Sequence, residues 1–138
     1  MADAFVIGGT EFGVDRASLK VEFPLRPDGL VNVHLEVGGD ESVFESVSED
    51  ERWSWALYPP FFCVRRFPIS PGDAELDRPI QIPGRDETFE MNLYMMEYCE
   101  VTSVVVQREV GGISIEGRVD MWGKDMPFRI QLDGACEV

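Results

Sequence analysis

Residues 102–122 read Thr-Ser-Val-Val-Val-Gln-Arg-Glu-Val-Gly-Gly-Ile-Ser-Ile-Glu-Gly-Arg-Val-Asp-Met-Trp. Two runs rich in Val and Ile flank Gly111-Gly112, and a two-residue glycine turn between such runs is typical of a β-hairpin. The second run alternates with period two, which gives a strand one apolar and one polar face. The apolar face holds Ile113, Ile115, Gly117, Val119 and Met121, and the polar face holds Ser114, Glu116, Arg118 and Asp120. Gly117 on the apolar face predicts a bulge or a close approach by another segment.

A third strand follows this hairpin. A turn is expected at residues 123–125, and residues 127–132 then alternate again, with Phe128, Ile130 and Leu132 on the apolar side. Asp133 and Gly134 end the pattern. Residues 102–132 therefore predict a three-stranded antiparallel meander.

The rest of the chain gives shorter strand signals. Alternating runs at 19–23 and 31–37 are separated by the turn signal Pro27-Asp28-Gly29. The run 31–37 puts its valines and leucine on one apolar face. Further strands are expected at 4–7, at 43–47, at 61–67 between two prolines, and at 80–82, where flanking prolines limit the strand to an edge. Residues 88–101 favour one long strand, although the phase slips near residue 95 and a Met-rich helix is the alternative.

Residues 48–58 fit two structures. Ser48 with the acids after it resembles a helix N-terminus, whereas Trp53, Trp55 and Leu57 alternate as in a strand. We favour the strand and keep one short helix as the alternative. With no internal repeat or linker, residues 1–138 predict a single all-β, mostly antiparallel domain. The expected architecture is a sandwich or open barrel of about 8–10 short strands.

The charge balance restricts the partners. There are 26 Asp and Glu residues against 12 Lys and Arg, a formal net charge of −14. Nucleic-acid phosphates and anionic membranes repel such a surface, and a basic partner is favoured because complementary charge raises the encounter rate. Solubility alone is the simpler explanation of the same charge. Ten of the 12 basic residues are arginines, which we expect to join strands to neighbouring acids.

The sequence carries no recognisable catalytic, metal or cofactor motif. His34 is the only histidine, and its place in the alternating run 31–37 predicts an exposed face. Cys63, Cys99 and Cys136 lack Cys-x-x-Cys spacing, and the first two are expected to be core thiols. The N-terminus does not resemble a signal peptide, and no apolar run is long enough to span a membrane. We therefore expect a non-enzymatic cytoplasmic protein.

Two neighbouring features predict a binding surface. Eight acids lie between Pro27 and Glu51 without an intervening Lys or Arg, and aromatic residues follow directly. An apolar centre with a charged rim is typical of a protein interface, and Trp and Tyr dominate binding hot spots. A solvated acidic loop and two core tryptophans are the alternatives. The candidate partner-binding residues are Asp40, Glu41, Glu45, Glu49, Asp50, Glu51, Trp53, Trp55 and Tyr58.

These features favour an acidic protein-binding module. Its expected role is that of an inhibitor, such as a bacterial immunity protein or antitoxin, which neutralises a basic enzyme or toxin. The alternative is a small-ligand-binding β-barrel protein or enzyme whose pocket is lined by aromatic and Met side chains. A structural subunit that pairs strands with its own copies is a third hypothesis. The Pro-framed segments argue against it because they protect the edges.

Overall fold

A computed structural model of the chain describes residues 3–46, 58–95, 98–121 and 123–134. Within them the chain forms ten strands, one short α-helix and one 3-10 helix. None of the described helices is both long and apolar enough to cross a membrane. The strands are β1 Ala4–Ile7, β2 Thr10–Glu11, β3 Asp15–Glu22, β4 Val31–Gly38, β5 Phe61–Ile69, β6 Ile80–Pro83, β7 Glu90–Tyr94, β8 Tyr98–Glu109, β9 Gly112–Met121 and β10 Lys124–Asp133. The helices are α1 Glu41–Ser46 and the 3-10 helix η1 Pro71–Glu75.

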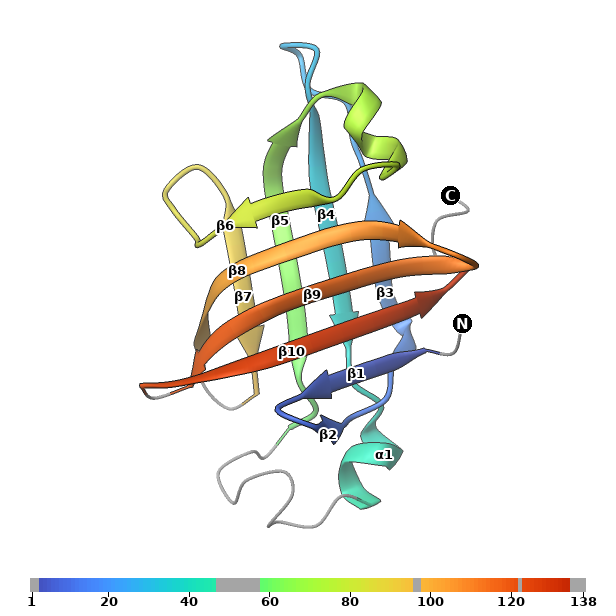
Figure 1. Cartoon of the computed structure of the whole chain (residues 1–138), viewed down its shortest axis with the longest axis vertical. Helices are drawn as coiled ribbons and strands as arrows, with labels where there is room; N and C mark the ends of the chain where they lie inside the picture. Colours follow the sequence, from blue (N-terminus) through green and yellow to red (C-terminus); the bar gives the residue numbers. More distant parts are fainter. Residues whose placement is uncertain (1–2, 47–57, 96–97, 122, 135–138) are drawn as a thin grey trace.

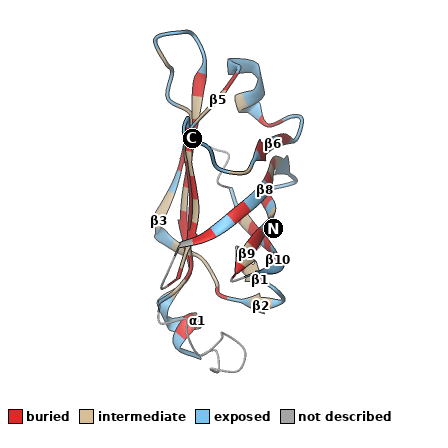
Figure 2. Ribbon diagram, turned by 90° about the vertical axis from the view of Figure 1, so that its left-hand side faces the viewer, coloured by how far each residue is buried: buried red, intermediate tan, exposed pale blue. Residues whose placement is uncertain are grey.

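The strands form one curled antiparallel sheet in the order β2-β1-β10-β9-β8-β7-β5-β4-β3, with β6 paired to β8. The sheet folds into a half-barrel of two layers. Strands β8, β9 and β10, continued by β1, run across β3, β4, β5 and β7 behind them (Figure 1). The buried residues of the two layers face each other (Figure 2). The expected all-β open barrel and the meander at 102–132 are confirmed.

Strand β8 connects the two layers. Its first residues pair with β7, at Leu93↔Cys99, and the remainder pairs with β9. The register shifts between Val101 and Ser103, and such a bulge lets a strand bend from one layer into the other. Gly117 pairs with Val104, just beyond this bulge. An added Cβ there would be 2.5 Å from the Ser103 carbonyl oxygen and 2.7 Å from the Phe128 ring. The expected close approach at Gly117 is therefore confirmed.

The core lies between the layers. The alternating apolar faces of β4 and β9 are both buried, as their patterns predict. Phe62 from one layer packs on Phe128 from the other, with ring centroids 5.3 Å apart. Cys99 is also buried in this hydrophobic core, which we call the core cluster. Burial of these apolar side chains supplies the main drive to fold. The polar faces of β3, β4, β5 and β7 remain on the outside, and there they gather charged groups.

The strand predicted at 43–47 is wrong over the described residues, because residues 41–46 form helix α1. Asp40 caps this helix, since its Oδ1 accepts a hydrogen bond from the Val43 N–H at 3.0 Å. Phe44 is 5% exposed and stacks on Phe12, with centroids 6.1 Å apart. One buried aromatic side chain is enough to hold a single helical turn against the barrel. Two apolar residues in sequence were too short a pattern to distinguish this turn from a strand.

The single long strand favoured for 88–101 is also wrong. Strand β7 ends at Tyr94, and β8 returns antiparallel beside it from Tyr98. The slip in alternation near residue 95 marks a reversal of the chain. Met95 at this point is fully buried.

Strand β5 continues beyond its predicted end, through Pro68 to Ile69. Pro68 pairs with Asn32, whose N–H points away from β5 and donates to the Pro24 carbonyl at 2.9 Å. The Asn32↔Pro68 pair is therefore not hydrogen-bonded, and the missing proline N–H faces the side of β5 opposite β4. Strand β7 pairs with β5 only as far as Arg65, so it offers no acceptor there. The edge strand expected near 80–82 is confirmed as β6.

Candidate functional site

The predicted binding surface lies partly at one end of the barrel, where β4 meets α1. Asp40 is half-buried there and acts as the helix cap, so its carboxylate is occupied by the backbone. Glu41 and Glu45 are exposed on α1, one turn apart. Neither forms an ion pair among the described residues. Among the described residues, therefore, no cationic side chain offsets the charge of these two exposed glutamates.

Tyr58 returns to the same end of the barrel. The Gly39 N–H donates to the Pro60 carbonyl at 2.7 Å, which joins the start of α1 to the segment that carries Tyr58. Tyr58 is 54% exposed, a high value for a large aromatic residue. We call Asp40, Glu41, Glu45 and Tyr58 the acidic end. The helix or strand expected at 48–58 lies outside the described residues except for Tyr58. The remaining predicted binding residues also lie outside them: Glu49, Asp50, Glu51, Trp53 and Trp55.

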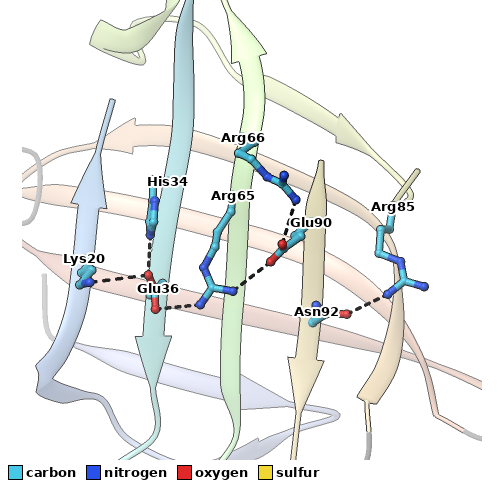
Figure 3. Close-up of polar contacts among 8 residues, drawn as sticks. All are labelled: Lys20, His34, Glu36, Arg65, Arg66, Arg85, Glu90 and Asn92. Carbon is cyan, nitrogen blue, oxygen red and sulfur yellow. Dashed lines mark hydrogen bonds and ion pairs between the residues drawn. The ribbon is translucent and has the colours of Figure 1, made fainter. Parts of the chain in front are cut away.

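A second cluster covers the outer face, which is the side of the β3-β4-β5-β7 layer away from the meander (Figure 3). Cross-strand pairing builds it in rows. One row runs Lys20, Glu36, Cys63 and Asn92 from β3 to β7, since these residues are register partners. His34 lies on the same face of β4, half-buried, as its phase in the run 31–37 predicts.

Glu36 is the carboxylate with the most basic contacts on this face. It accepts a hydrogen bond from Arg65 Nη2 at 3.0 Å, contacts His34 Nε2, and lies 4.0 Å from Lys20 Nζ. Its side chain is 14% exposed. The Arg65 hydrogen bond, followed by that of His34, lowers the pKa of Glu36 from 4.5 to about 2. The same contact with Glu36 raises the pKa of Arg65 further.

Glu90 extends these contacts along the face. Arg65 Nη1 donates to its Oε2 at 3.1 Å, and Arg66 Nη2 donates to its Oε1 at 2.8 Å. These contacts form one continuous series across four strands, which we call the ionic chain (Figure 3). Its members are, in order, Lys20, Glu36, Arg65, Glu90 and Arg66. Both carboxylates of the chain are neutralised, which confirms the expectation that arginines join strands to acids.

A β-bulge makes this chain possible. Consecutive strand residues point to opposite faces, so Arg65 and Arg66 would ordinarily separate. The register shifts between Val33 and Leu35, and two β5 residues there lie opposite one β4 residue. Arg66 has φ of 67°, a left-handed conformation that costs a non-glycine residue on the order of 1 kcal/mol. The bulge turns both guanidinium groups to the outer face.

A shallow depression of about 270 Å³ opens beside this chain. Cys63 and Asn92 form part of its lining, and Arg85 donates from Nη1 to Asn92 Oδ1 at 3.3 Å. Cys63 is only 3% exposed, and this burial raises the pKa of its thiol. The expected buried thiol is confirmed, although Cys63 lies under the outer face and outside the core cluster. The complete lining is Phe61, Cys63, Arg65, Arg85, Glu90, Asn92 and Tyr94.

The sequence did not single out Glu36, Arg65, Arg66, Glu90 or Arg85. Their proximity depends on the order β7-β5-β4-β3, which no local pattern encodes. One signal was available in the consecutive arginines within the apolar run 61–67, because two adjacent charges interrupt strand alternation. Within the part of the chain that the structure describes, no His, Cys, Asp or Glu group is arranged to hold a metal ion.

Comparison with known proteins adds no relative to these observations. No protein-family model, curated protein or solved structure matches the chain. The function is therefore argued from the two surfaces alone.

Proposed function

We propose that the protein is a non-catalytic binding module that neutralises a basic protein partner through its acidic end. The carrying observation is that Glu41 and Glu45 are exposed on α1 without an ion pair among the described residues, at the end of the barrel that also holds exposed Tyr58. Exposed carboxylates and an aromatic side chain at one end of the barrel suit a basic partner, because the charges steer the encounter and the ring packs on contact.

The distribution of basic residues supports this choice of surface. Lys20, Arg65 and Arg66 lie on the outer face, in contact with Glu36 or Glu90. Glu49, Asp50, Glu51, Trp53 and Trp55 lie outside the described residues and stay predicted contact residues on the basis of sequence alone. An immunity protein or antitoxin that fills a cleft built for phosphates would need this kind of acidic surface.

The proposal places the protein in the cytoplasm, where thiols stay reduced. The buried, free thiol of Cys63 supports this. The alternative of a barrel pocket has less support. The sequence predicted a pocket lined by aromatic and Met side chains. Met91, Met95 and Phe62 are instead packed in the core, where each is at most 1% exposed.

The test compares partner binding by a triple variant, Asp40→Asn, Glu41→Gln and Glu45→Gln. Asparagine keeps the helix cap while removing the charge, so the fold is retained. Partners are captured from host lysate by the wild-type protein, identified by mass spectrometry and then titrated calorimetrically with purified material. We expect a basic partner whose affinity falls as salt rises, and at least about a tenfold loss with the triple variant at low salt.

A matched control removes three exposed acids elsewhere: Asp77→Asn, Glu109→Gln and Glu116→Gln. It changes the net charge equally but leaves the acidic end intact, so its affinity should stay close to wild type. Equal losses in both variants would mean that total charge matters and the acidic end does not. Absence of a basic partner at both low and moderate salt would overturn the proposed function.

A further inference from the structure

The depression on the outer face has donors that the ionic chain does not use. Arg65 and Glu90 on its rim are engaged with each other, and Glu90 is also engaged by Arg66. Arg85 differs, because its only described side-chain contact is the 3.3 Å hydrogen bond to Asn92 Oδ1. Its guanidinium is exposed and forms no ion pair within the described residues. Arg85 therefore brings one uncompensated positive charge to the depression.

Asn92 adds a second donor beside Arg85. Its Oδ1 accepts a hydrogen bond from Arg85 (Figure 3). Within the part of the chain that the structure describes, its Nδ2 group has no acceptor, so these N–H donors can serve a ligand. A guanidinium fork and an adjacent amide N–H match the two oxygens of a carboxylate. The surrounding protein carries a net charge of −14, so a bound anion should have a low charge. These donors favour a singly charged, planar carboxylate.

The remaining lining is apolar or aromatic. Phe61 and Tyr94 are register partners at the start of β5 and the end of β7, and both border the depression. The buried Cys63 side chain lies one row away, between them and the charged rim. At about 270 Å³ the depression is at the small end of ligand sites. A ligand with one ring and one carboxylate would place its ring near Phe61 and Tyr94 and its oxygens near Arg85.

We propose that this depression binds a small aromatic carboxylate, held by Arg85 and Asn92 at its oxygens and by Phe61 and Tyr94 at its ring. Arg66 in a left-handed conformation supports a functional role for this face, since backbone strain of this kind concentrates at binding sites. The site is separate from the acidic end and does not depend on the protein-binding proposal.

Benzoate is the probe, followed by amide chemical shifts in NMR spectra of the full chain. We expect saturable shifts at Phe61, Cys63, Asn92 and Tyr94 at millimolar benzoate, because a small ligand in an open site binds weakly. Benzamide keeps the ring but loses the charge, so it should bind at least about tenfold more weakly. Inorganic phosphate keeps an anion without a ring and should also bind more weakly. Phosphate binding as tightly as benzoate would assign a bare anion site and overturn the proposal.

Arg85→Gln is the decisive variant, and it should weaken benzoate binding by about tenfold or more. Arg85→Lys keeps the charge without the fork and should give an intermediate affinity. Arg129→Gln is the matched control, since Arg129 is an exposed arginine on β10 in the other layer. Arg85 and Arg129 are both exposed, so all three variants should keep the wild-type spectrum. Equal affinities of Arg85→Gln and Arg129→Gln, or no saturable shift at these residues, would refute the site.

Discussion

Glu36 shows how one residue couples the outer face to pH. It contacts Arg65, His34 and Lys20, and its pKa falls from 4.5 to about 2. A carboxylate with a lowered folded-state pKa adds stability above its unfolded pKa, and that stability is lost as pH falls through the folded value. The contribution of Glu36 is therefore complete above pH 4.5 and disappears towards pH 2.

Glu36→Gln tests this coupling. Near neutral pH the variant should lose about 2 kcal/mol of unfolding free energy, less than the full pKa difference implies because solvent screens the pair. The difference in unfolding free energy between wild type and variant should disappear as the pH falls from 4.5 to about 2. Urea unfolding across this range measures it. A gap that stays constant with pH would show that the variant acts through packing and not through the charge of Glu36.

Gly117 is the residue at which packing, and not charge, fixes the sequence. A Cβ at this position would lie 2.5 Å from the Ser103 carbonyl oxygen, a backbone atom that cannot move aside alone. We expect Gly117→Ala to cost about 2 kcal/mol or more in unfolding free energy. Gly72→Ala is the control, since no atom lies within 4 Å of its added Cβ. Equal stability of the two variants by urea unfolding would mean that β8 and β9 separate easily.

At the scale of elements, helix α1 breaks a rule of helix design. Glu41 in its first turn suits the helix dipole, but its last turn contains no basic residue and instead places Glu45 near the negative end of the dipole. Glu41 and Glu45 also repel each other across one turn. Charges that oppose stability in this way are expected where they serve binding.

Glu45→Lys should therefore stabilise the protein. Replacing repulsion by attraction to Glu41 and the helix end should add about 0.5 kcal/mol to the unfolding free energy. The same variant should bind the basic partner more weakly, because it reverses one charge of the acidic end. Thermal unfolding and calorimetric titration measure the two effects. Stabilisation with unchanged partner affinity would remove Glu45 from the proposed contact surface.

The elements also show what the sequence could predict. The meander at 102–132 and strand β4 were predictable because one buried and one exposed face impose period two. Helix α1 was not, since its place depends on Phe44 reaching Phe12 from a distant part of the chain. The ionic chain on the outer face was not predicted for a similar reason. Arg65 and Arg66 share a face only because of a bulge, and Glu36 and Glu90 reach them through strand order.

For the whole molecule, the net charge of −14 should oppose folding through self-repulsion. The ionic chain acts in the other direction, but it holds only two of the 26 acids. Sodium chloride screens both the repulsion between acids and the attraction within the ionic chain. Because the repulsions are more numerous, their weakening should dominate the effect of salt on stability. We therefore expect unfolding free energy to rise by on the order of 1 kcal/mol from low to moderate salt at neutral pH.

The same change in salt should have the opposite effect on partner binding, which relies on attraction between unlike charges. Repeating the unfolding series near the isoelectric point of about 4.3 provides the control, since self-repulsion is then small and the rise in stability should vanish. Stability that falls with salt at neutral pH would mean that the ionic chain outweighs the repulsion. An excess of acids that weakens the fold yet speeds the encounter with a basic partner is the pattern expected when the charge is kept for binding.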